Sequence, residues 1–316
     1  MQHITDAMID ALVTPADAQA VLEDAWRSFG EGQAAMQERI RTEAGGVKLS
    51  TLGAVIPGQN VAGAKVYSTI AGQFNFVILL FSTEDGRPLA SLEAGAITRL
   101  RTAACSVIAA RRMARPGAKR LALLGAGVQG RAHAEQFAAA FGLERIRFCD
   151  PHGRLGLVAE LQARCRVPVQ SCATPLETIE DADIIVTASR ATEPLFPGEA
   201  IPAGCFIAAV GSSLPHTREL DDTALRRASR IAVEWKPQSL REAGDLVRAA
   251  PDALLPEGKL VELADLVTGR VQGRLGPEDI TVYKTVGVGL QDVALAGLAW
   301  RRLQESGGAP GHTIAT

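Results

Sequence analysis

A glycine-rich turn near the middle of the chain carries the clearest chemical signal. Gly125, Gly127 and Gly130 follow a short apolar run of strand length and precede a helical pattern with apolar residues three and four apart. A second strand-like run then ends at Asp150, twenty residues beyond the last glycine. Strand, glycine turn, helix, strand and acid, in this order, are the parts of a dinucleotide-binding unit.

Each glycine of the turn has its own physical reason. Gly125 allows the tight turn, Gly127 lets a pyrophosphate approach the backbone, and Gly130 lets helix and strand pack closely. The helix that starts at the glycines, with its pattern over 131–141, presents free N–H groups, and its dipole favours negative charge at that end. The turn therefore predicts a site for the phosphates of a nucleotide cofactor.

Asp150 decides which cofactor we expect. Its carboxylate can accept hydrogen bonds from both hydroxyl groups of a ribose and would repel a 2′-phosphate. His152 and Arg154 place positive charge close by, which weakens that preference. We expect NAD(H), with NADP(H) as the less favoured alternative.

A second group of candidate residues is cationic and precedes the turn. Lys65 interrupts an apolar, strand-like run, and Arg101 with Thr102 lies in an alanine-rich helical segment. Arg39 and Arg41 stand just before the strand region. The structural alternative for each is a charge on a solvated face, because buried lysine and arginine are rare.

Polar residues at strand ends form a third group. Ligands of open parallel sheets bind beyond the carboxyl ends of the strands. Thr187, Ser213 and Lys284 follow or end strand-like runs in the second half of the chain. These three residues are therefore candidates for lining a bound ligand.

The elements that position these residues change in type along the chain. The first part has helical patterns, then strands divided by glycine and proline turns, then a long alanine-rich helix; an antiparallel sheet is the natural interpretation. The helices are expected at 6–12, 14–29 and 94–113, and the strands at 47–52, 61–68, 74–81 and 89–92.

Beyond Pro116 and Gly117, strands and helices alternate, which indicates a parallel sheet covered on both faces. We therefore expect an α/β protein with two domains. A Rossmann-type doubly wound domain spans 116–289, and an α+β domain spans 1–115 together with a C-terminal helix in 290–316. The residues from Gly307 onward read as a frayed tail.

Composition excludes several classes of protein. With 316 residues and 47% hydrophobic content, the chain can fill two cores. A net charge of −2 and 4% aromatic residues argue against nucleic acid as a partner. The chain has neither an apolar run long enough for a membrane span nor a leader pattern, so we expect a soluble, cytoplasmic protein.

The five cysteines give no sign of a metal site or a disulfide framework. Their number is odd and none has CxxC spacing, so reduced and mostly buried thiols are expected. They are Cys105, Cys149, Cys165, Cys172 and Cys205.

Four segments together resemble the ornithine cyclodeaminase and mu-crystallin family, and the resemblance covers almost the whole chain. The segment 98–106, with its Arg-Thr-Ala-Ala run, and the glutamine-containing glycine turn are the specific parts. The four segments are Ala64-Lys65-Val66, 89–94 followed by 98–106, Gly125 to Gly130, and 211–221.

The resemblance implies a homodimer whose first domains join their antiparallel sheets, with the active site between domains and a nicotinamide facing a small imino or amino acid. It implies that Lys65 and either Arg39 or Arg41 bind the substrate carboxylate, and that Arg101 lies near the cofactor phosphates. The implied cofactor lining is Thr102, Gly125, Gly127, Val128, Gln129, Gly130, Asp150, Thr187, Val210, Gly211 and Ser212.

Ser213 is the main departure from the cyclodeaminase pattern. In the ornithine cyclodeaminases that the chain resembles, a catalytic aspartate stands at this position and handles the substrate amine. Serine does not ionise near neutral pH, so Ser213 cannot serve as a carboxylate base. Ketimine reductases of the mu-crystallin type resemble this chain in having serine, and their reaction needs only hydride delivery to a C=N carbon.

The resulting hypothesis is an NADH-dependent reductase of small cyclic imino acids, such as 1-pyrroline-2-carboxylate or its six-membered homologue. Three alternatives stay open. Ornithine cyclodeamination would yield proline and ammonia from ornithine with catalytic NAD. An alanine dehydrogenase or acyclic imino acid reductase would require ammonia with an oxo acid, and a non-catalytic binding protein would keep cofactor affinity without turnover.

Overall fold

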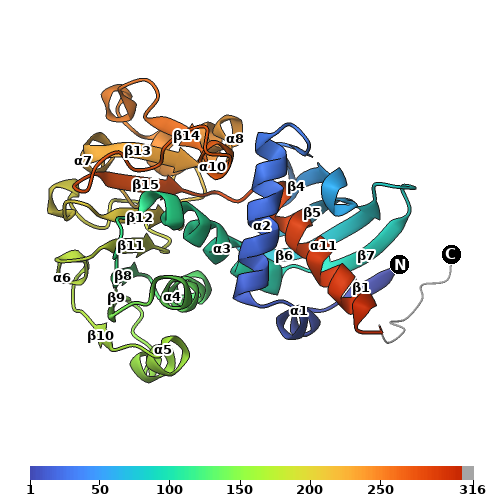
Figure 1. Cartoon of the computed structure of the whole chain (residues 1–316), viewed down its shortest axis with the longest axis horizontal. Coiled ribbons are helices and arrows are strands. Elements are labelled where there is room, and N and C mark those ends of the chain that lie inside the picture. Colours follow the sequence, from blue (N-terminus) through green and yellow to red (C-terminus); the bar gives the residue numbers. More distant parts are fainter. Residues whose placement is uncertain (308–316) are drawn as a thin grey trace. The chain divides into compact units, whose positions relative to one another are not determined.

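A computed structural model describes residues 1–307 of the chain, and the expected C-terminal tail lies almost entirely outside them. The described chain forms two compact units (Figure 1). The first comprises Met1–Cys105 and the segment that starts at Gly287, and the second is Ser106–Val286. The boundary expected at Pro116 falls later than this division, because the long helix α3 (Gly95–Met113) runs through it without a loop.

The first unit is built on a seven-stranded mixed sheet with strand order β1-β7-β6-β5-β4-β2, in which β3 also pairs with β4. Its central strands β4, β5 and β6 pair antiparallel over ten residues each, as the strand patterns predict. The strands are β1 (Gln2–Ile4), β2 (Ala35–Met36), β3 (Ile40–Ala44), β4 (Val47–Ile56), β5 (Val61–Ile70), β6 (Gln73–Ser82) and β7 (Pro88–Glu93).

The sheet also has one strand that was not predicted and that pairs parallel. Strand β1 pairs parallel with β7, through Gln2↔Ala90 to Ile4↔Leu92. A strand of three residues is too short to show an alternating pattern, so the sequence gives no signal for it.

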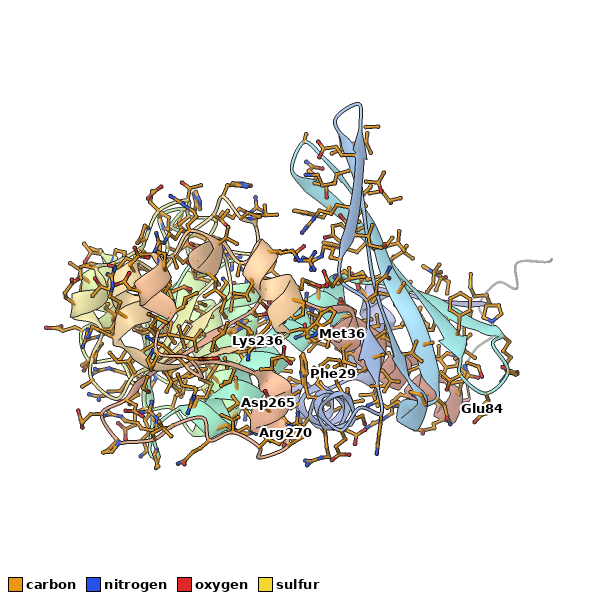
Figure 2. The ribbon with its side chains drawn as sticks, turned by 90° about the horizontal axis from the view of Figure 1, so that it is seen from above. Phe29, Met36, Glu84, Lys236, Asp265 and Arg270 are labelled. Carbon is orange, nitrogen blue, oxygen red and sulfur yellow. The ribbon has the colours of Figure 1, made fainter. Side chains whose placement is uncertain are left out.

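Helices α1 (Asp6–Leu12), α2 (Pro15–Gly30) and α11 (Gly289–Glu305) belong to the first unit. Helix α2 begins with a capping box between Thr14 and Asp17 and with Pro15 in its first turn. Helix α11 packs against α2 and against strands β4 and β5 (Figure 1). Figure 2 shows the tips of the β3–β4 and β5–β6 hairpins extending away from these helices.

The start of α11 approaches the sheet unusually closely. A Cβ atom on Gly289 would lie 2.5 Å from the carbonyl oxygen of Gly53, in the middle of β4. A Cβ atom on Gly53 would in turn lie 2.9 Å from the carbonyl oxygen of Gly63 on β5. Backbone therefore packs on backbone where the helix meets β4.

The second unit is an eight-stranded sheet in which every pair of neighbouring strands is parallel, with order β10-β9-β8-β11-β12-β15-β13-β14. Fully buried strands such as β11 and β12 are continuous apolar runs, as expected for a sheet covered on both faces. The strands are β8 (Arg120–Leu124), β9 (Arg145–Cys149), β10 (Val169–Ser171), β11 (Ile184–Thr187), β12 (Phe206–Ala209), β13 (Ala228–Val233), β14 (Leu260–Glu262) and β15 (Ile280–Lys284).

The connections of the second unit include seven further helices, of which the last three were not predicted. They are α4 (Val128–Phe141), α5 (Leu157–Cys165), α6 (Pro175–Ile179), α7 (Asp222–Arg227), then α8 (Lys236–Glu242), α9 (Gly244–Val247) and α10 (Leu263–Val267) in the segment before β15. Short 3-10 turns occupy Pro57–Gln59, Gly198–Ala200 and Pro251–Leu254. Within residues 1–307, the helices are all too short or too polar to cross a membrane.

Candidate active site

The glycine turn has the geometry that its three glycines predict. Gly125 has a φ of +92°, and a Cβ atom there would lie 2.6 Å from the carbonyl oxygen of Ala188. A Cβ atom on Gly130 would lie 2.0 Å from the carbonyl oxygen of Gly125, so only glycine lets α4 start this close to β8. Gly127, by contrast, meets no atom within 4 Å, which leaves room for a ligand against the backbone.

The N-terminus of α4 is open to a ligand. Gly127 is the N-cap residue and supplies no side-chain acceptor for the first N–H groups of the helix. Val128 is 57% exposed although it is apolar, and Gln129 is half-buried. Uncapped N–H groups at the start of a helix of fourteen residues suit the phosphates of a dinucleotide.

Asp150 lies directly after β9 and braces the turn. Its Oδ2 accepts a hydrogen bond from the backbone N–H of Ala126 at 2.9 Å, and its Oδ1 accepts one from the N–H of His152 at 2.9 Å. A carboxylate offers about four lone-pair sites, so both oxygen atoms can still accept from a ribose. The predicted ribose-binding acid is therefore held at the mouth of the glycine turn.

The loops after β11 and β12 are held by one buried carboxylate that sequence reasoning did not identify. Glu219 is 0% exposed and accepts five hydrogen bonds. Its Oε1 accepts from the N–H of Ser189 at 2.8 Å and from the hydroxyl of Ser189 at 2.7 Å. Its Oε2 accepts from Thr187 Oγ1 at 2.8 Å and from the N–H groups of Gly211 and Ser212 at 2.7 and 3.2 Å.

Glu219 is itself held by a buried ion pair. The N–H groups of Glu219 and Leu220 donate to Asp245 Oδ1 at 2.7 and 2.9 Å, and Asp245 Oδ2 lies 2.9 Å from Lys284 Nζ. Burial raises the pKa of Glu219, while the positive charge of Lys284 acts in the opposite direction. Lys284, predicted from its place at the end of β15, thus supports the neighbouring loops from within.

Among the predicted residues of this loop, Val210 and Gly211 donate backbone N–H groups to the carbonyl of Thr187, at 2.8 and 3.2 Å. Ser212 is buried and its hydroxyl donates to the carbonyl of Thr217 at 2.9 Å. Ser213 is half-buried, and its N–H donates to the carbonyl of Gly211 at 3.1 Å. The roles expected for Ser212 and Ser213 stay predictions.

The first unit contains a second candidate site, built around Lys65. Lys65 is 3% exposed and belongs to the face of the sheet that also carries buried Leu52 and Ile78, its direct partners on β4 and β6. Its Nζ donates to Thr98 Oγ1 at 2.6 Å, lies 3.3 Å from Asp292 Oδ1, and stands 4.3 Å from the centre of the Phe76 ring. The alternative of a solvated lysine is therefore wrong.

Arg101 lies beside Lys65 in the same unit. Its Nη1 donates to Gln291 Oε1 at 2.8 Å and its Nε lies 3.5 Å from Asp292 Oδ1, and the residue is 7% exposed. Arg101 is therefore not the exposed helix charge of the structural alternative, and its role near cofactor phosphates stays a prediction. Thr102 is buried in α3 and donates to the carbonyl of Thr98 at 2.7 Å.

The two candidate arginines before the sheet differ in position. Arg39 Nη2 donates to the carbonyl of Gly287 at 2.7 Å, and its charge is one of those that act on Lys65. Arg41 lies on β3 opposite Ser50, further toward the tip of the hairpin. The contacts favour Arg39 as the partner of Lys65, and the assignment itself stays a prediction.

The electrostatics of the Lys65 site are unusual. Burial lowers the pKa of Lys65 to about 8; Asp292 raises that pKa, while Arg101 and Arg39 lower it further. Two buried cations, Lys65 and Arg101, share the single carboxylate of Asp292. Asp292 and Gln291 come from the first turn of α11, where the sequence shows an ordinary amphipathic helix and gives no sign of a site.

The doubly wound sheet and the glycine turn define the chain as a dinucleotide-binding protein with a Rossmann-type unit. Residues 1–307 match the model of the ornithine cyclodeaminase/mu-crystallin family. The chain belongs to this family, which confirms the resemblance found in the sequence.

Three known proteins illustrate the similarity. A Delta(1)-pyrroline-2-carboxylate reductase of Bacillus cereus is 32% identical over 84% of this chain and 79% of its own length. The structure of a probable ornithine cyclodeaminase from Bordetella pertussis Tohama I is 60% identical, with a TM-score of 0.95 over 99% of this chain and 100% of that one. The structure of Thermococcus litoralis Delta(1)-pyrroline-2-carboxylate reductase in complex with NADH and L-proline is 26% identical, with a TM-score of 0.92 over the same shares.

Proposed function

We propose that this protein is an NAD(H)-dependent reductase of small cyclic imino acids. The chain is an oxidoreductase of a family that acts on imino and amino acids, and it resembles two pyrroline-2-carboxylate reductases over most of its length. The substrate class proposed is a five- or six-membered cyclic imine that bears a carboxylate next to the C=N bond.

The observation that carries this proposal is the charge of the Lys65 site. Lys65 and Arg101 are both buried, yet within the described residues 1–307 they have one carboxylate between them, Asp292, at ion-pair distance. Buried charges are stable only when they are paired, so this site favours an anionic ligand. A small carboxylate that binds there would balance the remaining positive charge, with Arg39 offering a planar, bidentate donor group.

The second unit supplies the residues that suit a dinucleotide. Gly127 and the start of α4 would hold the pyrophosphate, and the carboxylate of Asp150 would accept hydrogen bonds from the adenosine ribose. The negative charge of Asp150 disfavours a 2′-phosphate, which supports NADH over NADPH. When bound, the reduced nicotinamide supplies the hydride.

The reaction balances with one hydride and one proton. The protonated imine carbon receives the hydride with its electron pair, the C=N bond becomes a single bond, and the nitrogen keeps its proton in the secondary amine. The cationic group of Lys65 and Arg39 would hold the carboxylate and so orient the C=N carbon. No water needs to be activated, so the reaction requires no carboxylate base at position 213.

Ornithine cyclodeaminase is the second candidate, because the 60% identical structure carries that probable function. That reaction releases ammonia and needs a base that acts on the substrate amine. Ser213 cannot supply it, since a hydroxyl does not ionise near neutral pH. The acyclic reductions of oxo acids with ammonia use the same kind of site and differ in their need for free ammonia.

One assay separates these functions. The purified protein is incubated with NADH and with 1-pyrroline-2-carboxylate, 1-piperideine-2-carboxylate, or pyruvate with and without ammonia, and NADH oxidation is followed. Ornithine with NAD⁺ serves as the cyclodeaminase control. We expect oxidation with the cyclic imines alone; proline formation from ornithine, or activity only with ammonia, would reject the proposal.

The proposal includes a homodimer formed through the outer face of the mixed sheet. The pairing register places several apolar side chains on this one face, each 39–53% exposed: Ile40, Val47, Leu49, Val55, Ile70 and Phe81. The same face carries a hollow of 470 Å³ whose lining includes Gly53, Ala64 and Phe81. Exposed apolar surface of this extent marks an association surface.

A further inference from the structure

We propose that Asp292 is a positioning residue of the substrate site: its buried carboxylate is the counter-ion that Lys65 and Arg101 share, and it keeps Lys65 protonated and holds the two cations side by side. This inference rests on the proposed function, because the carboxylate of the proposed imino acid substrate is the ligand that the two cations would bind. Asp292 is 0% exposed and lies in the first turn of α11, whereas Lys65 lies on β5 and Arg101 on α3.

The geometry joins three elements through one oxygen atom. Asp292 Oδ1 lies 3.3 Å from Lys65 Nζ and 3.5 Å from Arg101 Nε. Gln291, one residue earlier, accepts from Arg101 Nη1 at 2.8 Å and so holds the guanidinium from a second side. Asp292 Oδ2 is buried and accepts no hydrogen bond from the part of the chain that the structure describes.

The start of α11 explains how a carboxylate can stay charged in this place. The partial positive charge of a helix N-terminus favours an anion in the first turn. Two adjacent cations favour the same charge. Without Asp292, Lys65 and Arg101 would repel each other in a buried setting, and Lys65 would be the one to lose its proton, since arginine stays protonated.

Among the partners that the described part of the chain offers, Lys65 keeps one donor for a ligand. An ammonium group has three N–H donors. Thr98 Oγ1 and Asp292 Oδ1 accept two of them, at 2.6 and 3.3 Å. The ring of Phe76 has its centre 4.3 Å from Nζ and limits the positions of the ammonium group, but it accepts no conventional hydrogen bond from it. Asp292 therefore sets both the charge and the orientation of the remaining donor.

The first test measures the titration of Lys65 directly, without substrate. The chain has six lysines, so ¹³C-labelling of lysine Cε gives a spectrum that can be assigned with Lys65→Met. In the wild-type protein, Lys65 should titrate near pH 8, because burial lowers its pKa to about 8. In Asp292→Asn, which removes the anion without changing shape, the pKa of Lys65 should fall by about one unit or more.

Two matched variants complete this test. Asp292→Glu keeps the charge and should return the pKa of Lys65 to within about half a unit of its wild-type value. Asp245→Asn removes a buried carboxylate from a different lysine pair, with Lys284, and should shift the resonance of Lys284 and not that of Lys65. An unchanged Lys65 titration in Asp292→Asn overturns the proposal.

The kinetic consequence separates positioning from a merely structural role. In Asp292→Asn, KM for the cyclic imine at pH 8 should rise about tenfold or more, because Lys65 is then largely neutral. At pH 6.5 and saturating substrate, kcat of this variant should stay within about threefold of the wild-type value. Equal losses in kcat and in apparent substrate affinity at all pH values would contradict the proposal. A wild-type protein that reduces none of the imines would reject the proposed function and leave the Lys65 titration as an independent result.

A double variant keeps the proposal falsifiable if Asp292→Asn does not fold. Lys65→Met combined with Asp292→Asn removes one positive and one negative charge together. The proposal requires this double variant to be more stable in urea than Asp292→Asn alone, because the unpaired cation is gone. A double variant that is no more stable than the single one overturns the proposal.

Discussion

The buried charge of Lys65 lowers the stability of the folded protein, and the same charge is available to bind the substrate carboxylate. Its pKa is lowered from 10.5 to about 8, so the folded protein favours the neutral form more than the unfolded chain does. Below pH 8 the folded state carries the full cost of the buried charge. Between about pH 8 and 10.5 the unfolded chain binds the extra proton, so the stability contributed by this group rises with pH.

The variant Lys65→Met should therefore separate activity from stability. We expect kcat/KM for the cyclic imine to fall about 100-fold or more, since a carboxylate contact is lost. The free energy of unfolding at pH 7 should rise by up to roughly 3 kcal/mol, the equivalent of the pKa shift, and this gain should vanish above about pH 10.5. Urea unfolding at several pH values checks both the sign and the window.

The control for this prediction is Lys48→Met. Lys48 is 40% exposed in its side chain and pairs with Glu43 at 3.1 Å, so its removal should change stability by less than about 1 kcal/mol at any pH. If Lys65→Met is clearly less stable than wild type at pH 7, the prediction is wrong. That result would show that the contacts of the Lys65 ammonium group in the folded protein outweigh the cost of burying its charge.

At the scale of elements, substitutions of the glycines in the turn should affect cofactor binding and stability separately. Gly127→Ala adds a methyl group in open space at a negative φ, so the protein should fold normally while its Kd for NADH rises about tenfold or more. Gly130→Ala places a Cβ atom 2.0 Å from the carbonyl oxygen of Gly125 and should lower thermal stability markedly. Fluorescence titration with NADH and thermal unfolding measure the two effects; normal NADH affinity in Gly127→Ala would remove the turn from the cofactor site.

Glu219 gives a second prediction at this scale, because one side chain joins the loops after β11 and β12. In Glu219→Gln, one acceptor oxygen is replaced by an N–H₂ group that faces N–H and O–H donors. We expect a loss of about 2–4 kcal/mol in stability and about a tenfold weaker NADH affinity. Glu193→Gln is the control, since Glu193 is 75% exposed in its side chain and forms a surface ion pair with Arg248. Unchanged NADH affinity in a folded Glu219→Gln protein would show that these loops do not shape the cofactor site.

The sequence was sufficient for the elements whose signal is local. The glycine turn, Asp150 and the strands of the parallel sheet other than β14 were predicted, because each rests on a spacing of a few residues. Asp292 and Glu219 were not predicted as site residues. From the sequence alone, a carboxylate in a helix or loop cannot be distinguished from a solvent-exposed charge, because its partners are distant in the chain. Lys65 and Asp292 are 227 residues apart in the chain, so only the fold brings them together.

At the scale of the whole molecule, the outer face of the mixed sheet predicts association. Leu49→Asp places a charge among the exposed apolar side chains of this face, where Leu49 is 48% exposed. We expect the variant to sediment as a monomer while the wild-type protein sediments as a dimer in analytical ultracentrifugation. Val158→Asp, on α5 of the second unit and 37% exposed, is the matched control and should leave the dimer intact. A wild-type monomer would reject the proposed assembly.

The close approach of Gly289 to Gly53 has an electrical consequence. The first turn of α11 can place Asp292 against Lys65 only because Gly289 has no side chain, since a Cβ atom there would lie 2.5 Å from the carbonyl oxygen of Gly53. A methyl group at residue 289 would act as a spacer and move the anion away from the cations. The charge state of a lysine on one strand thus depends on a side chain that is absent from the helix packed against the neighbouring strand.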